Sequence, residues 1–388
     1  MQRSDKFIFA VLFFSIFSAV MGVGIVVPLL PIYALNLGAS GMYIAFIFGA
    51  FSLSRTIMLP WFGRLCDKKG RKPYLVAGLF AYALISVAFI LSKSVDTLIG
   101  VRFIQGIASA MIMPAAQAYI GDITPRGKEG TVMGFFNLSV FGGLSIGPLM
   151  GGIIHDHFSM NAAFLCMGGL ALAGSVLCFF FLPRTKLEKV VTQDLKSLSL
   201  RILIKDVELI GFFVFRLVYT FCIGIIWCFL PVFASLGFRL STSEIGILVT
   251  LAVFVSGLLN VPMGFVADRF NKKVMVSFGG MIITWSIYSF VLADGFQDLF
   301  VANFLFGLGG GISMPALTAL AVIKGDETGS MGSVMALLTM AHSMGMLLGS
   351  FVAGLAMDLV SLQDAFPLGA FLMACGVVVF LVCNRKKV

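Results

Sequence analysis

Charged residues are scarce in this chain of 388 residues. Asp, Glu, Lys and Arg make up only 12% of it, whereas a soluble domain has about 25%. Apolar residues make up 59%, and the mean hydropathy is +1.04. A water-soluble globule of this composition would lack the polar side chains to cover its surface, which excludes most soluble enzymes. The abundance of hydrophobic residues also excludes an intrinsically disordered chain.

C-x-x-C cysteine pairs and metal-ligand spacings are also missing from the sequence. The chain has seven cysteines and three histidines. No two cysteines form a C-x-x-C pair, so the spacing favours neither a metal site nor a disulfide framework. We also find no nucleotide-binding glycine loop and no triad-like cluster. The sequence therefore predicts that the protein is not an enzyme and needs no cofactor or metal.

The net charge of +9 raises the question of a nucleic-acid partner. The cations lie in short clusters between apolar runs and form no continuous polar face, so we expect no nucleic-acid binding. Arg3 and Lys6 precede an apolar run that is longer than the apolar core of a cleaved signal peptide, about 7–15 residues. We interpret this run as an uncleaved first membrane span.

What the chain does contain is long apolar runs, and about 20 apolar residues cross a bilayer once as a helix. Every backbone polar group in lipid needs an internal partner, and these runs lack the alternation of barrel strands. The sequence thus predicts an all-α membrane protein embedded in a lipid bilayer. We expect twelve transmembrane helices, at 7–34, 42–62, 73–92, 98–121, 131–154, 161–182, 207–236, 244–266, 273–293, 298–322, 331–357 and 365–383.

The distribution of Lys and Arg supports this number of spans and orients them. Cytoplasmic loops carry an excess of cations. With the N-terminus inside, only Lys93 and Arg239 of the 27 cations fall in outside loops, and Arg55, Arg102 and Arg216 fall within spans. The pattern predicts a multi-pass protein of the cytoplasmic (inner) membrane with both termini in the cytoplasm.

The longest polar stretch, 184–206, divides the spans into two sets of six. We expect an N-terminal six-helix bundle at 1–183, a cytoplasmic linker at 184–206 and a C-terminal six-helix bundle at 207–388. The halves repeat: Gly106 and Pro114 recur as Gly307 and Pro315, and Asp156 recurs as Asp358. Duplicated halves are typical of secondary transporters, whose substrate site lies between the repeats near the midplane.

The loop after the second span carries a recognisable motif, Gly63-Arg-Leu-Cys-Asp67-Lys-Lys-Gly70-Arg71-Lys-Pro. It resembles the signature loop of the major facilitator superfamily, and the resemblance extends over the whole chain. Asp67 can meet the positive N-terminal end of span eleven, Gly70 permits a tight turn, and Arg71 can pair with Asp122. The resemblance implies that this cluster is a conformational switch, which latches the two pseudo-symmetric halves when the transporter faces outward.

Spans four and five carry two further motifs. Arg102-Phe-Ile-Gln105-Gly106 resembles a family motif whose arginine is linked to proton transfer. A buried arginine needs partners, and we expect them among backbone carbonyls of the first span near Pro28 and Pro31. An alternative is that Arg102 only extends toward Asp96 and the membrane surface. Span five resembles the packing motif of drug:proton antiporters, with small residues spaced for close helix contact, at Gly143, Gly147, Pro148, Gly151 and Gly152.

No Asp or Glu lies in the middle of any span. A buried carboxylate is a common proton carrier in exporters, so a different group must serve here if protons are coupled. The candidates are Arg102, Asp122 at the end of span four and His342 in span eleven, because imidazole changes charge near neutral pH. His342 could equally be a structural residue hydrogen-bonded to a neighbour.

The three arginines within spans have no midplane acid to balance them, which would favour anionic ligands over lipophilic cations. Arg55 and Arg216 could instead be structural. The other polar residues predicted to line the cavity suit an amphipathic ligand. The substrate-cavity candidates are Arg55, Gln105, Asn137, Arg216, Tyr219, Trp227, Asn260 and Asn303.

The sequence as a whole favours a monomeric secondary transporter that exports an amphipathic small molecule in exchange for protons by rocker-switch alternating access. An alternative is a uniporter or exchanger of a small organic anion. A lipid flippase or a non-transporting sensor is a weaker alternative, since a sensor is expected to carry a soluble signalling domain.

Overall fold

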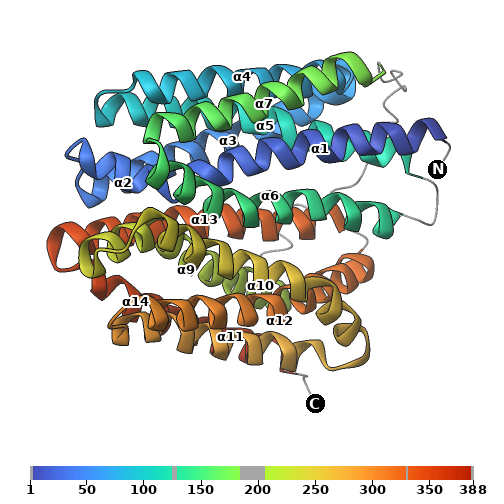
Figure 1. The fold of residues 1–388 in the computed structure, drawn as a ribbon. Helices are drawn as coiled ribbons and strands as arrows, with labels where there is room; N and C mark the ends of the chain where they lie inside the picture. Colours follow the sequence, from blue (N-terminus) through green and yellow to red (C-terminus); the bar gives the residue numbers. More distant parts are fainter. Residues whose placement is uncertain (1–2, 125–128, 184–205, 329–330, 386–388) are drawn as a thin grey trace. The chain divides into compact units, whose positions relative to one another are not determined.

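The computed structural model describes residues 3–124, 129–183, 206–328 and 331–385, and nearly all of these residues are α-helical (Figure 1). Within these ranges there is no β-strand. The described residues form twelve candidate membrane spans that are long and apolar enough to cross a bilayer, which confirms the predicted number. The helices are α1 Arg3–Val26, α2 Leu29–Asn36, α3 Gly41–Lys69, α4 Lys72–Leu91, α5 Val95–Ile123, α6 Glu129–His157, α7 Met160–Phe181, α9 Val207–Phe238, α10 Thr242–Arg269, α11 Lys272–Ser289, α12 Phe296–Thr328, α13 Met331–Leu359 and α14 Ala365–Cys383.

Local sequence signals set the ends of these helices. Pro28 lies in the break between α1 and α2, and together the two helices form the first span, Asp5–Asn36. Proline lacks the backbone N–H that would continue the ladder. Ser94 and Thr97 form a capping box at the start of α5, and the Asp206 carboxylate accepts from backbone amides at the start of α9. The polar caps satisfy the free amides of a helix's first turn.

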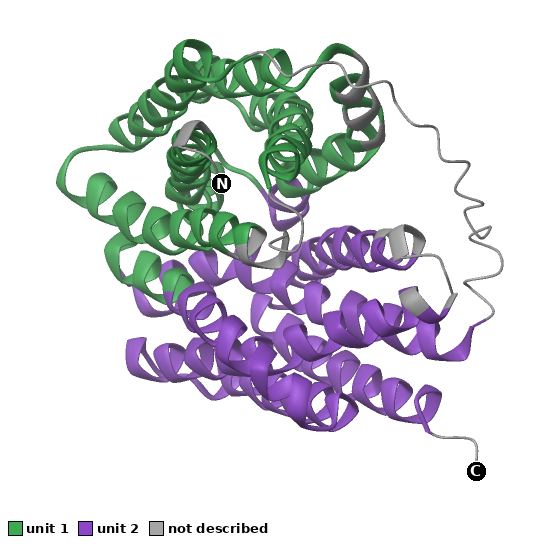
Figure 2. Ribbon diagram, turned by 90° about the vertical axis from the view of Figure 1, so that its right-hand side faces the viewer, with its two compact units in different colours: residues 1–39, 46–191, 241–250 green, residues 40–45, 192–240, 251–388 purple. Residues whose placement is uncertain are grey.

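The chain divides into two compact units (Figure 2). Unit 1 contains residues 1–39, 46–191 and 241–250, and unit 2 contains residues 40–45, 192–240 and 251–388. The start of α3 therefore belongs to unit 2, and the start of α10 belongs to unit 1. The predicted linker 184–206 lies outside the described residues except for Asp206, and the predicted six-helix boundaries stay a prediction.

The two units use the same helix-packing pattern. In unit 1, α1 packs against α6 and α7, and α4 packs against α5 and α7. In unit 2, α9 packs against α13 and α14, and α11 packs against α12 and α14. Each pair of packed helices in unit 1 corresponds to a pair at the same positions in the helix order of unit 2. The packing confirms the pseudo-symmetry that the repeated sequence motifs predict.

Glycines fix equivalent close contacts in both units. A Cβ atom on Gly106 of α5 would lie 2.4 Å from the Phe51 carbonyl oxygen of α3, and one on Gly307 of α12 would lie 2.6 Å from the Ala252 carbonyl oxygen of α10. Any side chain here would push the two backbones apart. The repeated Gly106 and Gly307 thus mark the same helix crossing in each unit.

Candidate functional site: polar clusters within the two units

The polar cluster of unit 1 is built around Arg102, which is 4% exposed. Its Nε donates to the Ile47 carbonyl oxygen of α3 at 3.3 Å, and its Nη1 donates to Gln105 Oε1 at 2.7 Å. Its guanidinium carbon also lies 4.5 Å from the centre of the Phe51 ring. The hydrogen bonds and the ring face stabilise a cation inside an apolar bundle.

The carbonyl partner of Arg102 differs from the predicted one. We expected its carbonyl partner in the first span, near Pro28 and Pro31, but the carbonyl that its Nε binds belongs to Ile47 of α3. The reason is that Gly106 brings α5 into backbone contact with α3. The alternative that Arg102 extends toward the membrane surface is wrong, because the side chain is buried against α3.

Two hydrogen-bond donors near this cluster have no partner among the described residues. They are Nε of Arg55 and Nε2 of Gln105. Gln105 is fully buried, and the backbone of Arg55 lies against the adjacent Gly106. Buried donors are normally paired, because an unmade hydrogen bond is costly. An oxygen atom of a bound substrate would satisfy such donors, so Arg55 and Gln105 remain substrate-contact candidates.

The polar cluster of unit 2 joins two predicted residues, Arg216 of α9 and His342 of α13. Arg216 Nη2 lies 3.3 Å from His342 Nδ1, and Arg216 Nη1 donates to the sulfur of Met314 in α12. A guanidinium has no acceptor, so Nδ1 must accept and the ring proton of neutral His342 must lie on Nε2. A second proton on Nδ1 would break this bond and place two cations side by side.

Tyr219 lies beside this pair and is itself buried. Its ring stacks on Phe306 with centroids 5.7 Å apart, and the Arg216 guanidinium carbon lies 5.9 Å from the Tyr219 ring centre. Its hydroxyl lies over Gly310, where a Cβ would be only 2.6 Å away. The structure therefore brings Arg216, Tyr219 and His342 together in one place.

The remaining cavity candidates do not join either cluster. Asn303 is fully buried; its amide donates to Leu299 in its own helix, and its Oδ1 has no hydrogen-bond partner among the described residues. Trp227 and Asn260 are partly exposed in α9 and α10, and Asn137 is exposed on α6. No hydrogen bond that the structure describes connects Trp227, Asn260 or Asn137 to Arg102 or to Arg216.

The signature loop adopts the turn that its glycine predicts. Gly70 has a φ of +88°, a conformation that favours glycine. Arg71 forms an ion pair with Asp122 at the end of α5, as expected. Gly63 and Asp67 lie in α3, but their side-chain positions are outside what the structure describes, so the contact of Asp67 with span eleven stays a prediction.

The glycines of the antiporter motif in α6 face two different neighbours. Cβ atoms on Gly143, Gly147 and Gly151 would meet backbone atoms of α1 at 2.9, 2.6 and 2.3 Å, respectively. A Cβ on Gly152 would instead lie 2.2 Å from the Thr242 carbonyl oxygen of α10. The Pro148 carbonyl oxygen faces Gly246 of α10. The motif is therefore a close-packed seam on two sides of α6.

Sequence reasoning noted that Asp156 and Asp358 are repeats of each other, but it gave them no role. In unit 1, Asp156 at the end of α6 accepts hydrogen bonds from the Thr242 hydroxyl and, at 2.8 Å, from the Ser243 amide at the start of α10. In unit 2, Asp358 at the end of α13 accepts from the Gly41 and Met42 amides of α3 at 2.6 and 2.9 Å. Each carboxylate thus caps the start of a distant helix.

We expect Asp156→Ala to lower the free energy of unfolding by about 0.5–2 kcal/mol, the usual loss when a helix cap is removed. Asp156→Asn should recover much of it, because an asparagine side chain still accepts from an amide. Thermal unfolding of the purified protein measures both. Asp364→Ala is the matched control, since Asp364 precedes α14 without bonding its amides. Equal unfolding temperatures for Asp156→Ala and wild type would contradict the cap.

Sequence reasoning also missed a cluster of charged side chains at the start of α9. Lys324 of α12 lies 2.8 Å from Glu208 and 3.2 Å from Asp206, and Lys273 of α11 lies 3.5 Å from Glu208. The loop of unit 2 that corresponds to the signature loop has Asn271 where unit 1 has Gly70, and Asn271 caps α11 through bonds to the amides of Lys273 and Val274. The acids are close to Lys324 only in the folded chain, so no local spacing could reveal them.

Comparison with known proteins agrees with these motifs. The profile of the Major Facilitator Superfamily matches residues 12–241 and 212–388. This chain belongs to the major facilitator superfamily. It is a multi-pass membrane transporter, and its twelve candidate spans agree with the family fold.

Similar major facilitator proteins include several with curated names. An uncharacterised transporter of this type from Methanocaldococcus jannaschii is 27% identical, with 99% of this chain and 100% of the relative covered. Multidrug resistance protein 2 of Bacillus subtilis is 26% identical, with 99% and 97% covered. Quinolone resistance protein NorA of Staphylococcus aureus strain MRSA252 is 28% identical, with 97% and 96% covered.

Solved structures show the same fold. The nucleoside transporter NupG superimposes with a TM-score of 0.83 at 14% identity, with 97% of this chain and 100% of that chain covered. A bacterial homologue of the human lysosomal transporter Spinster gives a TM-score of 0.80 at 14% identity, with 99% and 96% covered. At this identity the likeness concerns the fold of this major facilitator chain and not its substrate.

Proposed function

We propose that this major facilitator transporter exports amphipathic small molecules in exchange for protons. The observation that carries the proposal is the similarity to two relatives named for drug resistance, at 26% and 28% identity over almost the whole chain. The glycine seam of α6 supports it, because those glycines make the close backbone contacts with α1 that the antiporter motif requires.

Transport would proceed by alternating access through a rocker-switch motion. The six-helix halves predicted from the sequence place α6 in the first half and α10 in the second, yet Asp156 of α6 caps α10. Asp358 of α13 likewise caps α3. These two caps would have to open when the halves rock, while the Arg71–Asp122 ion pair within unit 1 would hold the signature loop in place.

His342 is the group we propose for proton coupling, because no acid lies in the middle of a span. Its Nδ1 accepts from Arg216 only while the ring is neutral. Protonation would release the guanidinium from the imidazole, and loss of the proton would restore the bond. A single proton could thus change the partner of Arg216 as the substrate enters or leaves.

Arg55, Arg102 and Arg216 support a second candidate function. They place three guanidinium groups within spans that have no acid in their middle, and Nε of Arg55 has no hydrogen-bond partner among the described residues. A uniporter or exchanger of a small organic anion would use such groups directly. We propose for either function a monomer in the cytoplasmic membrane with both termini inside.

Proton flux in proteoliposomes that hold a pH gradient tests the proposal. Lipophilic cations, neutral drugs and organic anions are added one at a time, with protein-free vesicles as the control. We expect a cationic or neutral compound to collapse the gradient only when the protein is present. If no compound moves protons while a labelled anion equilibrates, the exporter is wrong and the anion carrier replaces it.

The variant His342→Ala should abolish the drug-driven proton flux but retain drug binding, measured by fluorescence titration of the purified protein. His157→Ala is the matched control, because His157 is exposed at the end of α6 and bonds only its own helix in the described chain. Proton flux at the wild-type rate in His342→Ala would exclude this residue as the proton carrier.

A further inference from the structure

A groove in unit 1 lies between α4 and α7, and none of the substrate candidates lines it. Its volume is about 850 Å³. The apolar walls come from Val76, Ala77 and Phe80 of α4 and from Leu172, Val176 and Phe180 of α7. Several wall side chains are strongly exposed, with Phe80 at 48% and Phe180 at 71%. Such walls suit the acyl chains of a lipid.

One end of the groove is basic. Lys69, Gly70 and Lys72 of the signature loop line it. Lys69 is exposed, and the Lys72 ammonium donates to the Leu182 carbonyl oxygen at the end of α7 and lies 5.8 Å from the centre of the Phe179 ring. An ammonium has three donors, so Lys72 keeps donors for a further acceptor. In the part of the chain that the structure describes, no carboxylate forms an ion pair with Lys69 or Lys72.

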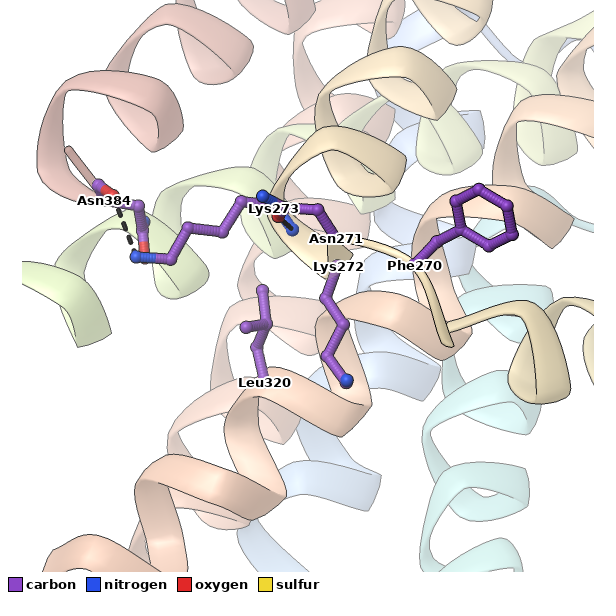
Figure 3. Close-up of a pocket in the computed structure, with 6 residues that line it drawn as sticks. All are labelled: Phe270, Asn271, Lys272, Lys273, Leu320 and Asn384. Carbon is purple, nitrogen blue, oxygen red and sulfur yellow. Dashed lines mark hydrogen bonds between the residues drawn. The ribbon is translucent and has the colours of Figure 1, made fainter. Parts of the chain in front are cut away.

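The equivalent site in unit 2 shows what the groove of unit 1 lacks. There Lys273 donates to the Asn384 carbonyl oxygen, as Figure 3 shows, just as Lys72 donates to that of Leu182. Lys273 also lies 3.5 Å from the Glu208 carboxylate. In unit 1, by contrast, the ring of Phe7 near the start of α1 packs against Phe181 of α7, and no carboxylate that the structure describes forms an ion pair with Lys72.

The start of α4 in unit 1 also differs from the start of α11, its counterpart in unit 2, in a way that favours an anion. Asn271 caps the amides of α11 in unit 2. Gly70 occupies the corresponding position in unit 1, and α4 begins at Lys72 without any side-chain cap. Free amides at a helix start attract anions through the helix dipole. The basic end of the groove therefore combines lysines and an uncapped helix, both of which favour a negative charge.

We propose that this groove binds an anionic phospholipid, with its phosphate at Lys69 and Lys72 and its acyl chains along α4 and α7. Basic pockets between membrane helices at the cytoplasmic side suit anionic head groups, and the cation distribution predicts that this loop is cytoplasmic. The bound phosphate would lie next to Gly70, in the loop whose Arg71 pairs with Asp122. The lipid would therefore stabilise the loop that the family uses as its switch.

Native mass spectrometry of the purified full-length protein tests the site. The protein in detergent is titrated with dioleoyl phosphatidylglycerol or, in parallel, with dioleoyl phosphatidylcholine. We expect phosphatidylglycerol to bind at least tenfold more tightly. Lys69→Gln with Lys72→Gln should weaken its binding by roughly tenfold to thirtyfold, the effect of two lysines at a lipid surface. Equal affinity for the two lipids would overturn the proposal.

Two further variants separate lipid binding from loss of the fold. Ala77→Trp fills the groove without changing its charge and should weaken phosphatidylglycerol binding by at least tenfold. Lys273→Gln removes the equivalent helix-end bond in unit 2 and should leave binding unchanged. Unchanged binding in Ala77→Trp, or displacement of the lipid by millimolar inorganic phosphate, would show that the apolar walls contribute nothing and would overturn the lipid site.

Discussion

Gly151→Ala is expected to destabilise the transporter, because the added methyl group would enter the close contact between α6 and α1. The new Cβ would lie 2.3 Å from the Ile25 carbonyl oxygen and 2.9 Å from the Ile25 Cα atom of α1. These are backbone atoms, so no side chain can turn aside, and α6 must move away from α1. Overpacking of this kind costs typically 1–3 kcal/mol. We expect a lower unfolding temperature and a loss of most drug transport.

Gly169→Ala of α7 provides the matched control. It lies in a helix of the same unit, and nothing lies within 4 Å of the Cβ that it would gain. Alanine favours a helix over glycine by about 1 kcal/mol, so Gly169→Ala should unfold at the same temperature as wild type or higher. Differential scanning fluorimetry measures both variants, and wild-type stability in Gly151→Ala would contradict the close contact between α1 and α6.

Arg102→Met is expected to remove transport almost completely. The methionine has a similar length, but it leaves the Gln105 side chain and the Ile47 carbonyl without the donor that now binds them. Truncating one partner of a buried charged hydrogen bond costs about 2–5 kcal/mol, which is roughly 30-fold or more in an equilibrium constant. We expect at least this loss in the rate of drug-driven proton flux.

The control for Arg102→Met is Lys93→Met, which removes an exposed cation outside the spans and should transport normally. Gln105→Leu separates two roles of the arginine. If Arg102 only orients Gln105, the two variants should lose transport equally. If the guanidinium itself takes part in coupling or substrate binding, Gln105→Leu should retain more. Wild-type flux in Arg102→Met would refute any role for this residue.

The fold could be predicted from the sequence because each span carries its own apolar run, which needs no distant partner to be recognised. The repeats of Gly106 as Gly307 and Asp156 as Asp358 also predicted the pseudo-symmetry, since duplicated helices repeat their packing. The Arg71–Asp122 pair was predictable because α4 and α5 are consecutive spans that cross the membrane in opposite directions. The start of α4, next to Arg71, and the end of α5, with Asp122, therefore lie on the same side of the membrane.

The rest of the site depends on contacts between residues far apart in the chain. The Arg102 carbonyl partner, Ile47, is an apolar residue whose side chain carries no signal. The caps of Asp156 and Asp358 bind amides of α10 and α3, which no local pattern connects with them. The pairing of Arg216 with His342 likewise required α9 and α13 to pack together. Such partners become visible only when the helices are placed in space.

The packing of α1 also bears on how the protein is made. Its Gly24 contacts Gly147 of α6, and its Gly22 contacts Met167 of α7, so the partners of the first helix are the last two of its unit. About 100 residues separate α1 from α6, which at about 5–20 residues per second means a delay of roughly 5–20 s during synthesis. Until α6 is synthesised, the glycine face of α1 must contact lipid or an insertion chaperone.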